Sequence, residues 1–143
     1  MSTQKEEQSI LHDAASVRAV AVLFSELADA YNARLKVEAP QLNSVEVYAR
    51  LQEEQRMRSI SNQLYFEAAD RILNVAGESQ AALEEVLKKS KRRLKKMEDW
   101  AAALDLIADL LVLAGAVLAR KPGPILAALK EVRDDIKSGT ADA

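Results

Sequence analysis

His12 is the only histidine in the chain, so a serine–histidine–aspartate triad or a histidine-containing metal site would have to use it. Metal sites in helical bundles usually take a Glu-x-x-His pair from each of two helices, which a single histidine cannot supply. The chain has no cysteine, which excludes disulfides, thiolate catalysis and cysteine-based zinc sites. We therefore expect a surface position for His12 and no catalytic, metal-binding or cofactor-binding residue.

Asp105 and Asp109 are four residues apart, so on a helix they share one face. Two neighbouring carboxyl groups are a possible acid–base pair. No histidine or cation lies near them in the sequence, and a narrow solvent-exposed strip explains both residues. The four glycines fit neither a Walker nor a dinucleotide-binding pattern. The sequence therefore predicts a protein that is not an enzyme.

A run of seven basic residues falls between positions 88 and 96. Its candidate contacts to an anionic surface are Lys88, Lys89, Arg92, Arg93, Lys95 and Lys96. The pattern favours a solvated segment with cations on every side but one, paired as Glu84–Lys88 and Glu85–Lys89. Contact with a membrane surface, or with nucleic acid or an acidic protein, remains an alternative. The net charge of −2 gives no general attraction for polyanions, so nucleic acid is not an expected partner.

A polar belt occupies the middle of the second expected helix, from residue 52 to residue 63, and two interpretations stay open. In the first, Glu54, Arg58 and Ser61 form a buried polar layer that fixes helix register. In the second, the helix offers a partner-binding face. The residues of that face are Arg56, Arg58, Asn62 and Gln63.

Residues 100–119 are almost entirely apolar, and the segment is long enough for the ~30 Å core of a bilayer. Its aspartates argue against insertion, since each costs about 2.5–3.5 kcal/mol near a helix centre while each Leu or Ile returns only about 0.3–0.6 kcal/mol. We favour a core or subunit interface, with a membrane span as the alternative. The predicted oligomer or membrane face comprises Trp100, Leu106, Ile107, Leu110, Leu113 and Val117.

The elements that would carry these residues are helices, because apolar residues recur in alternating steps of four and three along most of the chain. From Leu83 to Leu118 this spacing is continuous, and we expect one helix there with a possible kink at Trp100. Pro40 and the sequence Pro122-Gly123-Pro124 are expected to stop helices. The expected helices span residues 9–39, 44–76, 79–120 and 125–137.

The predicted fold is all-α: an antiparallel helical bundle of three long helices plus a short C-terminal helix, with coiled-coil-like packing. Residues 1–8 are expected to be a disordered lead-in, 9–137 a single helical-bundle domain, and 138–143 a disordered tail. The predicted function is a non-enzymatic protein–protein interaction module of the adaptor, regulator or inhibitor type. It would be cytoplasmic and act as a homo-oligomer, expected to be a dimer; the alternative is a membrane-associated bundle that uses residues 100–119 and the preceding basic run.

Overall fold

The computed structural model describes residues 10–66 and 78–141. Its helices are α2 (Ala14–Glu38), the short 3-10 helix η1 (Ala39–Gln41), α3 (Ser44–Phe66), α4 (Gln80–Lys96), α5 (Trp100–Ala119) and α6 (Pro122–Ala141). The all-helical prediction is confirmed, since the described residues contain these helices and no strand.

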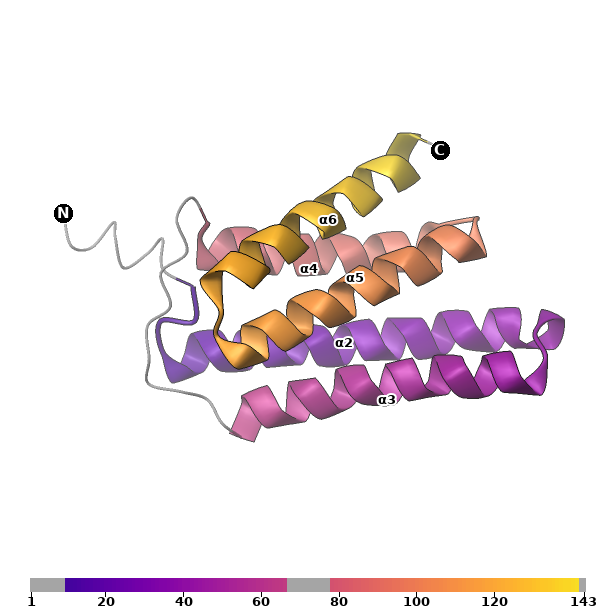
Figure 1. Ribbon diagram of the computed structural model, residues 1–143, viewed down its shortest axis with the longest axis horizontal. Helices are drawn as coiled ribbons and strands as arrows, with labels where there is room; N and C mark the ends of the chain where they lie inside the picture. Colours follow the sequence, from indigo (N-terminus) through magenta and orange to yellow (C-terminus); the bar gives the residue numbers. More distant parts are fainter. Residues whose placement is uncertain (1–9, 67–77, 142–143) are drawn as a thin grey trace.

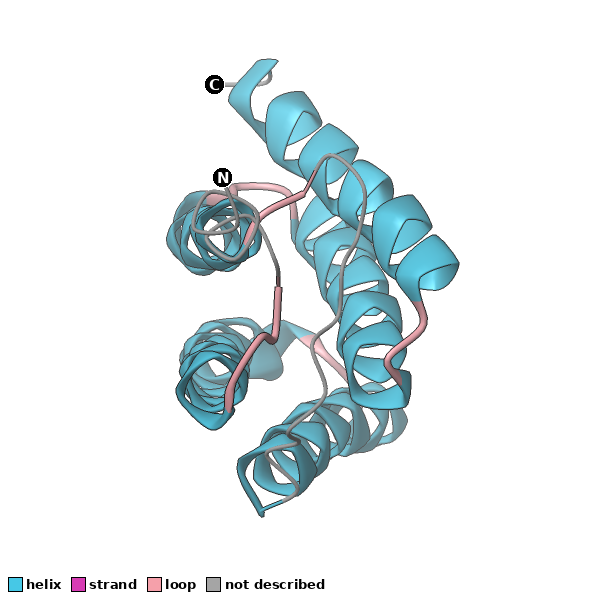
Figure 2. Ribbon diagram, turned by 90° about the vertical axis from the view of Figure 1, so that its left-hand side faces the viewer, coloured by secondary structure: helices cyan, strands magenta, loops and turns pink. Residues whose placement is uncertain are grey.

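The helices pack against one another around one apolar core (Figure 1). Helix α2 lies against both α3 and α4, while α5 packs mainly against α6 and α3. Successive helices run in opposite directions across the view of Figure 1. In Figure 2 the helix that leads to the C-terminus is inclined, whereas others are seen close to end-on. This arrangement gives α5 protein neighbours on several sides.

Helix α2 begins at Ala14, five residues later than the expected start at Ser9, so that prediction is wrong. Asp13 caps the helix, because its Oδ1 accepts a hydrogen bond of 2.7 Å from the backbone N–H of Ser16. Leu11 has a φ of 52°, which breaks any helix before this point. Ile10 and Leu11 are nevertheless fully buried. Ser9 and the expected lead-in lie outside the described residues.

Helix α3 begins at Ser44, as predicted. The Oδ1 of Asn43 accepts a 2.8 Å hydrogen bond from the backbone N–H of Glu46, which is the expected cap. Pro40 ends α2 as expected, and the chain makes a 3-10 turn there. The predicted continuation of α3 over residues 67–76 lies outside the described residues.

The single helix expected over residues 79–120 is wrong, since the chain breaks between α4 and α5, but the break comes directly before Trp100, where a kink was expected. Met97 adopts an extended conformation (φ −62°, ψ 127°), and Asp99 caps α5 by accepting a 3.1 Å hydrogen bond from the N–H of Ala101. Arg34 stabilises the break, because its Nη1 donates to the carbonyl of Leu94 over 2.9 Å. Two helices therefore replace the predicted one.

The C-terminal helix also differs from the prediction, because α6 starts at Pro122 and continues to Ala141. Proline is tolerated in the first turn of a helix, where its missing N–H would have no helical partner. The reversal between α5 and α6 instead uses Arg120, whose φ of 58° is left-handed. No proline follows Lys137, so nothing stops the helix at residue 138, where the tail was expected to begin.

Candidate functional site

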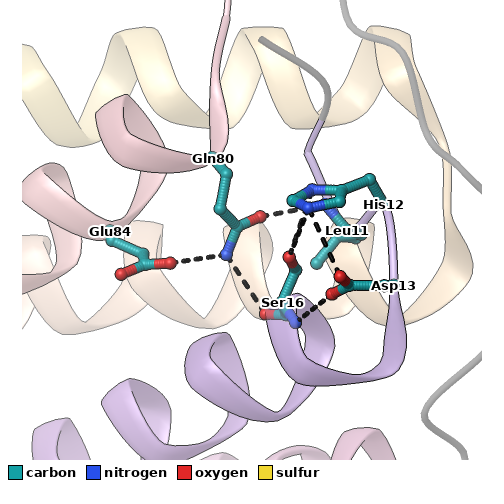
Figure 3. A network of polar contacts seen from close by, with 6 residues as sticks. All are labelled: Leu11, His12, Asp13, Ser16, Gln80 and Glu84. Carbon is teal, nitrogen blue, oxygen red and sulfur yellow. Dashed lines mark hydrogen bonds and ion pairs between the residues drawn. The ribbon is translucent and has the colours of Figure 1, made fainter. Parts of the chain in front are cut away.

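The side chains of Ser16, His12 and Asp13 meet at the start of α2 (Figure 3). The Oγ of Ser16 lies 3.1 Å from Nδ1 and 3.3 Å from Nε2 of His12, and Nε2 lies 3.5 Å from the Asp13 carboxylate. In a catalytic triad the two ring nitrogens contact different partners, whereas here both contact the same hydroxyl. The hydrogen bond from the Ser16 N–H lowers the pKa of Asp13 below its ordinary value. The cluster caps a helix.

Gln80, which no pattern in the sequence singled out, joins this cluster to the start of α4. Its Oε1 accepts a 2.9 Å hydrogen bond from the N–H of Leu11, and its Nε2 donates to the Ser16 carbonyl over 3.1 Å and to Glu84 over 2.7 Å. The side chain is buried, and both ends of the amide are used. Gln80 therefore holds the left-handed turn at Leu11 against α4.

Asp109 does not lie on a purely solvent-exposed strip, because Asp135 of α6 faces it. The pKa of Asp135 is raised to about 7. Burial is the largest cause, and the hydrogen bond and like charge of Asp109 come next. The charges of Asp105 and Glu131 add to the effect. Asp105 is exposed and Asp109 half-buried. Residues 10–66 and 78–141 contain no group of three or more side chains arranged to hold a metal ion. The pair can share a proton at a helix contact.

The basic run does not surround α4 evenly, in contrast to the prediction. Lys91 turns toward α2 and pairs with Glu26 at 2.8 Å, and Arg93 is half-buried. The exposed cations are Lys88, Lys89, Arg92, Lys95 and Lys96, which we call the basic stripe. At about 100° per residue they fall within an arc of about 120° on one face of the helix.

The two acidic partners expected for this run have other contacts. Glu84 accepts a hydrogen bond from Gln80, and Glu85 lies 3.5 Å from Arg92. The predicted pairs Glu84–Lys88 and Glu85–Lys89 are absent from this described helix. The lysines of the basic stripe therefore stay in solvent with their charge largely uncompensated.

The inner side of the polar belt forms a buried layer against α2, as the first interpretation predicted. Ser61 donates a 2.6 Å hydrogen bond to the carbonyl of Ala21. Glu54 is 7% exposed and accepts from Asn32 at 2.6 Å and from Arg58 at 2.8 Å. These bonds fix the rotation of α3 about its axis. A fixed rotation also decides which residues of α3 face outward.

Arg58 belongs to this inner layer, because its Nη2 also pairs with Asp29 at 2.8 Å. Its side chain is nevertheless 37% exposed and lines an open pocket together with Asn62 and Gln63, so its predicted place on a partner-binding face stays a prediction. The other three residues of that predicted face, Arg56, Asn62 and Gln63, are exposed. Gln63 donates a 3.3 Å hydrogen bond to Ser59 within the same helix. All four predicted members of this face therefore keep some contact with solvent.

A stripe of uncharged side chains runs along this outer face. Val45, Tyr48 and Phe66 are 77%, 65% and 84% exposed. Polar neutral residues fill the positions between them. The full set, which we call the neutral stripe, is Val45, Tyr48, Gln52, Gln55, Ser59, Asn62 and Phe66, all of them exposed. The sequence pattern indicated only the polar middle of this stripe, and the exposure of Tyr48 and Phe66 toward its ends was not predicted.

An open groove of about 750 Å³ lies beside the neutral stripe, between α3 and α5. Gln52, Gln55 and Ser59 line one wall together with the charged residues Glu53 and Arg56, and Ala108, Leu111 and Val112 line the other. Val112 is 60% exposed, which is unusual for α5. The groove therefore joins the neutral stripe to α5, with one acidic and one basic side chain beside it.

The predicted oligomer or membrane face of α5 forms the core of the chain itself. Its members Leu106, Ile107, Leu110, Leu113 and Val117 have no exposed area, because α3 and α6 cover the helix. Trp100 is half-buried, 6.4 Å from the ring of Tyr31. These side chains offer no exposed face in this arrangement.

Helix α5 is the one helix in the described ranges whose length and mean hydropathy of 2.2 would allow it to cross a membrane. Half of its apolar window is buried in the structure, and core helices of soluble proteins pass the same test. Comparison with known proteins found no matching family model, no similar curated protein and no similar solved structure.

Proposed function

We propose that this chain is a non-enzymatic protein–protein interaction module of the adaptor, regulator or inhibitor type, acting in the cytoplasm as a homo-oligomer. Its helices would form an antiparallel, coiled-coil-like bundle that presents α3 as the binding surface. The observation that carries the proposal is the neutral stripe, which leaves Val45, Tyr48 and Phe66 in water on a helix whose inner face is already satisfied.

Exposing these side chains has a cost that a partner would remove. Fully burying one large apolar side chain is worth about 1.5–3 kcal/mol, and aromatic residues dominate interface energies. Tyr48 and Phe66 lie at opposite ends of the stripe, so a partner that covers both must lie along the whole helix. A second helix has the right shape for this contact.

The candidate acid–base residues His12, Asp13, Asp109 and Asp135 lie in contacts within or between helices. These contacts favour a binding role over catalysis. Asp13 is a helix cap, and His12 lies against Ser16 of the same turn. Asp109 and Asp135 face each other where α5 meets α6, with other carboxyl groups nearby.

The test is the mass of the full chain in solution, measured by light scattering behind size exclusion from 1 to 200 μM. We expect a mass of twice the 15.7 kDa of one chain at the higher concentrations. A single-chain mass throughout would contradict the homo-oligomer and leave only binding to other proteins.

A second candidate function is association with an anionic membrane surface, which the basic stripe favours. Each surface lysine or arginine contributes about 1 kcal/mol near anionic lipid, and the attraction weakens with salt. The test is flotation with anionic and with neutral vesicles, comparing a variant with Lys88→Ser, Arg92→Ser and Lys95→Ser to the matched control Lys130→Ser on α6. Binding to anionic vesicles that the triple variant retains would contradict this function.

A further inference from the structure

We propose that the neutral stripe of α3 is covered by the same stripe of a second copy of this chain. The contact would be two-fold, and it would bring Gln55 opposite the Gln55 of the other copy. This inference rests on the proposed function and names its partner.

The spacing of the stripe is that of a helix that packs against another helix. From Val45 to Phe66 the steps are three, four, three, four, three and four residues. Residues with this period form the contact line of coiled coils, in which side chains of one helix fit between those of the other. In this stripe the four middle members are polar and the apolar ones lie toward its ends, so its apolar contacts would form near the ends of the pair. The stripe is about 32 Å long at ~1.5 Å per residue.

The rotation of α3 makes this face permanently available. Ser61 and Glu54 hold the opposite side of the helix against α2 through hydrogen bonds of 2.6 Å. Turning the stripe inward would break both bonds and leave a buried carboxylate without its donors, which costs several kcal/mol. The ring of Phe66 has an edge contact with Tyr65 of the same helix at 5.9 Å between ring centroids, yet Phe66 and Tyr48 stay 84% and 65% exposed.

The lack of charge in the stripe favours a second copy over a charged partner. A charged residue placed against Gln52, Gln55 or Ser59 would lose water without gaining an opposite charge. An amide side chain both donates and accepts hydrogen bonds, so a glutamine satisfies a second glutamine. Polar residues in a helix contact also fix its register and oligomeric state.

The order of residue types is the same in either direction at all positions but one pair. Val45 corresponds to Phe66, Gln52 to Ser59, and Gln55 lies at the centre, whereas the aromatic Tyr48 corresponds to the polar Asn62. With helices antiparallel, Val45 meets Phe66 of the other copy; with helices parallel, each residue meets itself. Both directions give the self-complementary surface that a two-fold interface requires. Both place Gln55 against Gln55.

The groove beside the stripe widens this contact beyond one helix. Val112 of α5 lies across it, and its side chain is more exposed than any other large apolar residue of that helix. A helix lying along the neutral stripe would cover Val112 as well. The proposed interface therefore draws on two elements that the core holds in fixed positions.

Two charge variants test the inference on the full chain. Gln55→Glu and Gln55→Lys each place like charges opposite each other, so each alone should weaken dimerisation at least tenfold by light scattering. An equimolar mixture of the two should restore the dimer, with one copy of each in every particle by native mass spectrometry. The matched control is Gln41→Glu, an exposed glutamine outside the stripe, which should dimerise like the unmodified chain.

The possible results separate the inference from the proposed function. If the unmodified chain is a dimer and the single variants remain dimers, the interface lies elsewhere, and only the inference is overturned. Loss of the dimer in both variants without recovery in the mixture also overturns it, because the two copies of residue 55 then do not face each other. A chain that is a monomer at all concentrations overturns both the inference and the homo-oligomer, while pulldown of another protein would preserve the interaction module.

Discussion

Two carboxyl groups of this chain, Glu54 and Asp135, differ in the groups that face them. Glu54 is buried, yet it accepts hydrogen bonds from Asn32 and Arg58, and Arg58 shares its charge with Asp29. Asp135 is less buried but faces a second carboxyl group, Asp109. Glu54 has donors on its carboxylate, whereas burial and the neighbouring carboxyl group of Asp109 raise the pKa of Asp135.

This difference predicts a pH dependence of stability centred on Asp135. Its pKa is raised from 3.8 to about 7 by burial, by its hydrogen bond and charge from Asp109, and by the charges of Asp105 and Glu131. Asp135 thus binds a proton more tightly in the folded state than in the unfolded state. Its contribution to the free energy of unfolding is therefore complete below about pH 4 and is lost as pH rises through 7. Asp135→Asn removes the charge and should stabilise the protein at pH 8.5.

We expect a gain of about 1 kcal/mol at pH 8.5 once solvent screening of this partly exposed group is allowed for, or about 3 °C in Tm. At pH 4 the same variant should melt within 1 °C of the unmodified chain, which checks that the effect follows protonation. Circular dichroism melts at both pH values measure it, with the exposed neighbour Asp134→Asn as control. An equal gain at both pH values would assign the effect to packing.

At the scale of elements, Arg34 determines where α4 ends. Its guanidinium donates to the carbonyls of Leu94 and Glu98, at 2.9 and 3.5 Å, and lies 5.8 Å from the centre of the Trp100 ring. Glu38 balances its charge at 3.1 Å. One buried cation thus satisfies the end of one helix and contacts the first residue of the next.

Arg34→Met should therefore destabilise the fold by about 2–4 kcal/mol, because it leaves helix-end carbonyls and Glu38 without their donor. Arg34→Lys keeps the charge but not the planar group with several donors, and should recover less than half of the loss. Urea unfolding measures both variants. Arg18→Met, an exposed arginine of the same helix, should change stability by less than 0.5 kcal/mol. A similar loss in Arg18→Met would show that the effect is not specific to the break.

Local signals predicted the helices well where the stabilising group is close in the sequence. Asn43 caps α3 three residues from its partner, and Pro40 ends α2 directly. The sequence indicated a kink at Trp100 but not two separate helices, because the apolar spacing continues through the break and Arg34, which stabilises it, is some sixty residues away. The Asp109–Asp135 pair was missed for the same reason, since only the folded chain brings α6 to α5.

At the scale of the whole molecule, the break decides what α5 does. The apolar residues of α5 suit a protein core and a subunit interface equally well, and its aspartates argue against a bilayer, so the sequence favoured the first two without choosing between them. A continuous helix would have carried them away from α2 and α3. The turn at Met97 folds α5 back onto the chain, where α3 and α6 cover it. The core therefore replaces the predicted subunit interface, and the outer face of α3 takes that place in our proposal.

Because α5 is buried in the core, we predict that it does not separate from the other helices while they stay folded. Its five fully buried Leu, Ile and Val side chains represent about 7–15 kcal/mol of burial, similar to the entire stability of a typical domain. Amide exchange over residues 106–117 should therefore be as slow as global unfolding, and neutral vesicles should not accelerate it. The protein should also stay unbound in flotation with neutral lipid. Exchange of α5 that is at least tenfold faster than that of α2, together with salt-resistant flotation, would instead show that α5 separates from the core and inserts.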